Sequence, residues 1–112
     1  MLAGVGGILV GLAPANINLA VHGAGALLQV LGAIGPLLLG VVAWSAWRPV
    51  AAFSLGCGVV GSAACVLYFS RSYLGLGHGG MEHLAFDPLT VWTTVLGVVL
   101  LGRWLAARRA IR

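Results

Sequence analysis

The 112 residues of this chain are 61% hydrophobic and 7% charged, and the mean hydropathy is +1.08. A soluble domain carries roughly 25% charged residues, so this composition excludes a chain that covers a water-facing surface by itself. The net charge of +4 comes from six arginines and two carboxylates, and the placement of the arginines indicates contact with the bilayer and no nucleic acid partner.

Apolar runs near the ~20 residues that span a bilayer occur at about 22–44, 50–69 and 88–105. A fourth run, Met1–Leu12, is too short to cross the hydrocarbon core. No linker or charge run divides the chain. The sequence therefore predicts an all-α polytopic transmembrane helix bundle, a single domain with three full spans and a partial N-terminal span at 1–12.

The partial span carries Gly4, Gly7 and Gly11 at three- and four-residue steps, which gives one smooth face for a neighbouring helix. A half-span exposed to lipid leaves backbone groups unpaired. We therefore expect this helix to be buried in a homo-oligomer or to be completed by a missing N-terminal half, and we favour the second explanation.

The turn before the first full span contains Asn16 and Asn18, either of which can cap the helix that follows. His22 then lies in the first turn, and Gln29 falls on the same face seven residues later. That face is expected to look into the bundle. It can serve helix packing or begin a polar pathway. Pro36 is expected to kink the helix.

The span at about 50–69 has two adjacent rows of small residues, which predict close helix packing. Cys57 and Cys65 lie about 12 Å apart along one helix, too far for a disulfide, and we interpret both as packing residues. The rows consist of Ser54, Gly58 and Ser62, and of Cys57, Gly61 and Cys65.

The segment 70–87 is predicted to be a loop because it contains several glycines. Within it, Met81–Phe86 is expected to form a short interfacial helix. Asp87 and Pro88 then resemble the N-cap and first position of the last span.

Arginine placement predicts the orientation. Arg48 and the four arginines at the C-terminal end lie on one side, and Arg71 lies on the other. The positive-inside rule then predicts a multi-pass protein of the cell membrane with a cytoplasmic C-terminus; arginine-, alanine- and glycine-rich usage suggests a bacterial inner membrane. The loop at 70–87 faces outward. Candidate residues for an outer polar site are His22, Gln29, Arg71, His78, Glu82, His83 and Asp87.

Three interpretations of these residues stay open. They can cap helices and pair with Arg71 at a wet interface, as parts of a binding or structural component. His22, His78 and His83 could instead hold a metal in a membrane hydrolase, although their spacing is not that of a helical ligand pair. A small-molecule transporter needs a carboxylate within a span, and none is predicted there. No cofactor, no metal site and no catalytic residue is assigned.

Two stretches suggest a family. The segment GILVGLAPANINLAVHGAGALLQ and the later GLGHGGMEHLAFDPLTVW resemble motifs of a bacterial integral-membrane family known as domain of unknown function 998. The resemblance carries the family's proline, histidine and glutamate over to Pro14, His22 and Glu82. His83 stands where the family usually has arginine. Family members are typically about twice as long, so the chain would match their C-terminal part only.

Overall fold

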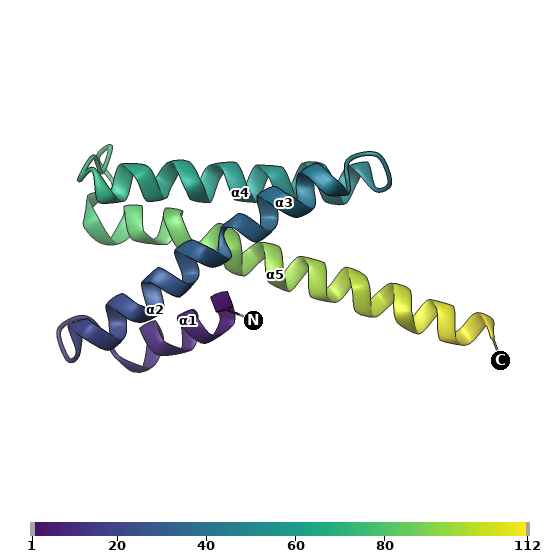
Figure 1. Ribbon diagram of the computed structural model, residues 1–112, viewed down its shortest axis with the longest axis horizontal. Helices are drawn as coiled ribbons and strands as arrows, with labels where there is room; N and C mark the ends of the chain where they lie inside the picture. Colours follow the sequence, from purple (N-terminus) through teal and green to yellow (C-terminus); the bar gives the residue numbers. More distant parts are fainter. Residues whose placement is uncertain (1, 112) are drawn as a thin grey trace.

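The computed structural model describes residues 2–111 as helices joined by short turns (Figure 1). The described part of the chain contains three helices long and apolar enough to cross a membrane, together with one shorter apolar helix, which confirms the predicted all-α fold. Met1 and Arg112 lie outside the described residues. The helices are α1 (Leu2–Leu12), α2 (Leu19–Gly32), α3 (Ile34–Val42), α4 (Arg48–Phe69) and α5 (Gly77–Ala110).

The first two helices form an antiparallel hairpin held by close backbone contact. A methyl group added at Gly6 would lie 2.5 Å from the carbonyl oxygen of Gly25, so both positions need glycine. Asn18 caps α2, because its side chain accepts a hydrogen bond of 3.1 Å from the backbone N–H of Val21. One of the two predicted caps is thus confirmed, and α2 begins at Leu19.

The helix is irregular close to Pro36, where the sequence predicts a kink. The first full span is interrupted at Ala33, between the end of α2 at Gly32 and the start of α3 at Ile34. Pro36 has no N–H to donate to the carbonyl of Gly32, four residues earlier, which explains why the α-helix breaks there.

The helix α4 is the most tightly packed, as the rows of small residues predict. It has six buried residues, whereas the much longer α5 has three. Gly58 faces Leu37 of α3, and Gly61 faces the carbonyl of Ala85 on α5. The fully buried hydroxyl of Ser54 accepts a hydrogen bond of 2.8 Å from the Trp92 indole. This helix therefore joins α3 to α5.

The last helix differs from the sequence prediction. It begins at Gly77 and continues through Pro88, so 70–87 is not a loop, Met81–Phe86 is not a separate helix, and Asp87 is not an N-cap. Met81, Ala85 and Leu89 recur at four-residue steps and are buried. Tertiary packing of this face outweighs the poor helix propensity of the glycines. The loop between α4 and α5 is therefore shorter than predicted and ends before Gly77.

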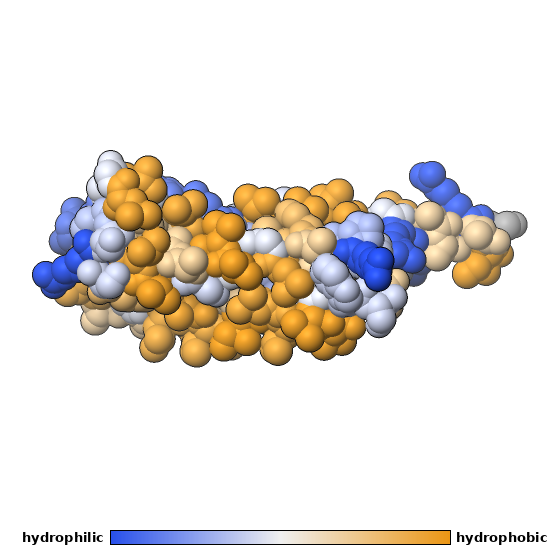
Figure 2. Space-filling model, turned by 90° about the horizontal axis from the view of Figure 1, so that it is seen from above, coloured by the Kyte–Doolittle hydropathy of each residue, from blue (hydrophilic) through white to orange (hydrophobic). Residues whose placement is uncertain are grey.

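The molecule is elongated, 54 × 27 × 20 Å, and its two ends differ. The α1–α2 turn and the α4–α5 loop lie at one end, and the α3–α4 turn lies toward the C-terminal end (Figure 1). Figure 2 shows apolar surface between hydrophilic residues that gather toward both ends. The guanidinium of Arg103 lies 4.4 Å from the ring of Trp47, which joins α5 to that turn.

The close approach of α1 and α2 predicts unequal effects of two identical substitutions. Gly6→Ala should lower the free energy of unfolding by about 1–3 kcal/mol, because its methyl group meets the backbone of α2. Gly4→Ala meets nothing within 4 Å and should be neutral or stabilising by up to about 1 kcal/mol through helix propensity. Unfolding in mixed detergent micelles measures both; equal effects would contradict this packing.

Candidate functional site

The polar residues of one end converge on a groove between the α1–α2 hairpin and α5. The smaller part of this groove is a cavity of about 280 Å³, and both carboxylate side chains of the chain line it. A second cavity of about 470 Å³ shares Gln29 and Thr90 with it and continues along α1 toward Ala3. We call the two together the polar groove. The smaller part is lined by Val10, Gln29, Glu82, His83, Phe86, Asp87 and Thr90.

His22 and Glu82 connect the two sides of the groove. The His22 Nε2 lies 3.7 Å from the Glu82 Oε1, and the two side chains are 18% and 30% exposed. The His22 Nδ1 lies 3.2 Å from the carbonyl oxygen of Ala13, so Nδ1 must carry the proton to donate to it. Nε2 then forms an ion pair with the Glu82 carboxylate only when it carries a proton as well, because the imidazole is positively charged only in that form. The contact is therefore a proton-dependent link between α2 and α5.

A second histidine–carboxylate pair lies within α5. The His83 Nδ1 is 3.2 Å from the Asp87 Oδ2, one helical turn away. The side chains are 78% and 63% exposed, so this pair leaves Asp87 accessible from the groove and from outside. Exposed pairs of this kind contribute little to stability. Because both side chains are exposed, a ligand can reach them.

Gln29 lies where the two parts of the groove meet. Its amide nitrogen would be 3.1 Å from a methyl group added at Gly7, so the glycine face of α1 makes room for this side chain. The side chain is partly buried. The expectation that Gln29 looks into the bundle therefore agrees with its position, and the amide can both donate and accept hydrogen bonds there.

Arg71 and His78 do not line the groove. The His78 ring lies 4.9 Å from the ring centre of Tyr68 and 5.6 Å from that of Tyr73, in an aromatic cluster at the α4–α5 loop. Arg71 lies in that loop with a left-handed φ of 59°. Within residues 2–111, no group of three or more His, Cys, Asp or Glu side chains could hold a metal ion. The three histidines thus do not form the metal site considered from the sequence.

In the smaller part of the groove, three lining residues escaped the sequence analysis, namely Val10, Phe86 and Thr90. Glu82, Phe86 and Thr90 follow one another at four-residue steps on one face of α5. This spacing could have revealed the face, but only with a helix that begins before Met81. Because Glu82 and Phe86 were predicted to lie within a loop, the sequence did not reveal this face.

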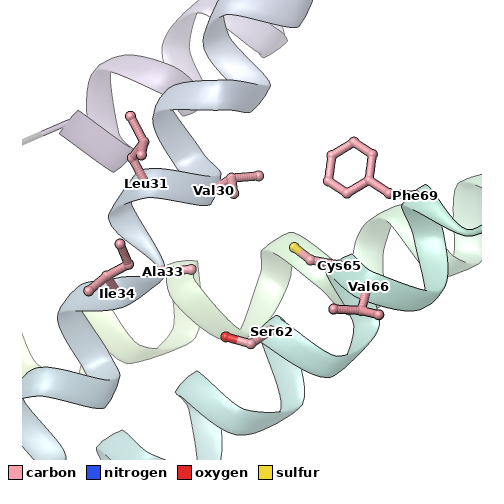
Figure 3. Close-up of a pocket in the computed structure, with 8 residues that line it drawn as sticks. All are labelled: Val30, Leu31, Ala33, Ile34, Ser62, Cys65, Val66 and Phe69. Atoms are coloured by element: carbon pink, nitrogen blue, oxygen red, sulfur yellow. The ribbon is translucent and has the colours of Figure 1, made fainter.

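A separate cleft lies beside the helix break at Ala33, between α2–α3 and α4 (Figure 3). It has a volume of about 520 Å³ and is almost entirely apolar. Because its walls offer few polar groups, it cannot recognise a charged ligand. Its lining residues are Val30, Leu31, Ala33, Ile34, Ser62, Cys65, Val66 and Phe69.

Comparisons with protein-family models, curated proteins and solved structures find no match to this chain.

The half-buried contact between His22 and Glu82 predicts energetic coupling. In slightly acidic buffer, a double-mutant cycle of His22→Ala and Glu82→Gln should give a coupling energy of about 0.5–1 kcal/mol in unfolding experiments. The matched cycle of His83→Ala and Asp87→Asn should give less, because that pair is exposed. Equal coupling in the two cycles would contradict a specific link across the groove.

Proposed function

We propose that the protein is a membrane-embedded binding component and that the polar groove binds a small organic cation with an apolar part. One observation carries this proposal: both carboxylates of a chain that is otherwise 61% hydrophobic line the same cavity. The Glu82 side chain is 30% exposed and contacts His22, and the Asp87 side chain is 63% exposed and pairs with His83, so a ligand in this cavity can reach both carboxylates.

The lining defines the chemistry of the ligand. Among the described residues no arginine lines the groove, so its carboxylates lack a permanent positive partner. Gln29 and Thr90 add hydrogen-bonding groups, whereas Phe86 offers an aromatic face that attracts cations. A ligand with an ammonium group and an apolar substituent would match the carboxylates and the apolar walls together.

The start of α5 at Gly77 favours a second candidate function, a proton-coupled carrier of the same cations. Glu82 and Asp87 belong to the same continuous helix as the last apolar run, so a helix and not a loop joins these carboxylates to the last span. A carboxylate that exchanges a proton for a cation would serve such transport.

Binding of benzyltrimethylammonium to the detergent-solubilised protein tests the proposal by calorimetry. Glu82→Gln and Asp87→Asn should each weaken binding about tenfold, because each removes one negative charge from the groove, and tenfold corresponds to about 1.4 kcal/mol. Arg71→Gln, which changes a charge at the same end of the protein outside the groove, should leave the affinity unchanged.

The uncharged isostere of this ligand, neopentylbenzene, provides the ligand control. Binding of both compounds with equal affinity, or no effect of either carboxylate substitution, would refute a cation site. Cation accumulation in vesicles driven by a proton gradient, and lost in the same two variants, would select the carrier over the simple binding component.

We further infer that the protein lies in a bacterial inner membrane with its C-terminus in the cytoplasm, which would place the groove opening on the outer side. Arg48 and the arginines of the C-terminal end of α5 support this orientation. The short motifs around Pro14, His22 and Glu82 support membership of the domain of unknown function 998 family, and the glycines of α1 support association with a second copy.

Reporter fusions test the orientation. A reporter active only in the cytoplasm should give signal after Arg112 and none after Gly75, which lies in the α4–α5 loop. The reverse pattern would place the groove opening on the cytoplasmic side.

A further inference from the structure

The end of the molecule opposite the groove opening carries positive charge without a negative side chain to balance it. Arg48, Arg103, Arg108 and Arg109 lie there, while Glu82 and Asp87 are the only carboxylate side chains of the chain. Asp87 and Arg103 are separated by about 24 Å along α5. This is about three Debye lengths at physiological ionic strength. Both ion pairs between side chains of residues 2–111 involve histidine and no arginine.

Two of these arginines are held against indole rings. The Arg103 guanidinium carbon is 4.4 Å from the centre of the Trp47 ring, and that of Arg108 is 3.9 Å from the Trp104 ring. A guanidinium placed over a ring uses one of its faces and keeps its N–H groups free for an anion. Tryptophan in turn favours the interface between hydrocarbon and headgroups. The pairs therefore fix cationic donors beside apolar rings at the ends of helices that can cross a membrane.

We propose that this end is a binding surface for the phosphate groups of anionic phospholipids. A phosphate accepts two parallel hydrogen bonds from a guanidinium, and the acyl chains would lie along the exposed apolar side chains of Trp104 and Leu105. A free anion would match the guanidinium groups but not these apolar neighbours. Nucleic acid would not match them either, because it has no acyl chains to cover these apolar side chains.

Native mass spectrometry of the full chain in maltoside micelles tests this surface with two lipids, phosphatidylglycerol and phosphatidylcholine. We expect phosphatidylglycerol to bind at least about fivefold more tightly, and Arg103→Gln to reduce its affinity about fivefold, the effect of one arginine near an anionic surface. Arg108→Gln should act similarly, and because it changes an exposed residue near the end of α5, the variant should fold normally. Arg71→Gln, at the opposite end, is the matched control.

Four outcomes would overturn the proposal. Equal affinity for the two lipids would mean that the charge of the headgroup is not recognised. An equal loss in Arg71→Gln would mean that only the total charge matters. Displacement of the lipid by millimolar inorganic phosphate would identify a free anion as the ligand. Preferential binding of a short oligonucleotide would identify nucleic acid as the partner.

Discussion

Close contact between helix backbones holds this fold together. Lipid chains are as apolar as leucine, so the burial of apolar side chains does little to drive helices together within a bilayer. The small residues of α4 therefore matter most: Gly58 admits Leu37 of α3, and Gly61 admits the backbone of α5 at Ala85. Since α3 and α5 make little contact with each other, their relative position depends on α4. The buried hydrogen bond between Trp92 and Ser54 fixes the register of α5 on the same helix.

The α1–α2 hairpin is attached to this unit more loosely, and the groove follows from that. Its helices contact each other extensively, whereas α2 meets α5 at few positions. The connections include the chain itself through the break at Ala33, the contact between His22 and Glu82, and the packing of Val30 against the buried cluster of α4 and α5. A rotation at Ala33 would change the width of the groove, because the hairpin lies on one side of the break and α3 is fixed on α4 on the other.

The fold could be predicted from the sequence where one residue type determines one feature. Hydropathy located the three long helices, the asparagines of the first turn indicated a cap for α2, Pro36 indicated an irregularity in the first span, and the small residues indicated the packed faces of α4. The prediction was wrong at Gly77–Pro88, where glycines and a proline have poor helix propensity and burial of Met81, Ala85 and Leu89 against other helices decides. Gln29, Glu82, His83 and Asp87, which line the groove, and His22, which contacts Glu82, were all named as candidates, but their proximity depends on that helical start. The aromatic neighbours that keep His78 outside it are tertiary contacts, which spacing alone does not reveal.

The charges at the two ends of α5 have different physical explanations, and this difference bears on function. Arg108 and Arg109 lie in its last turn, where the helix dipole favours positive charge. Their position therefore stabilises the helix even without a ligand. Glu82 and Asp87 lie beyond the first turn, which contains no acidic residue, and the effect of the dipole falls off within that turn. The helix dipole thus gives no reason for two carboxylates at these positions. Their common cavity does, which is why the groove is the stronger candidate for the function of this protein.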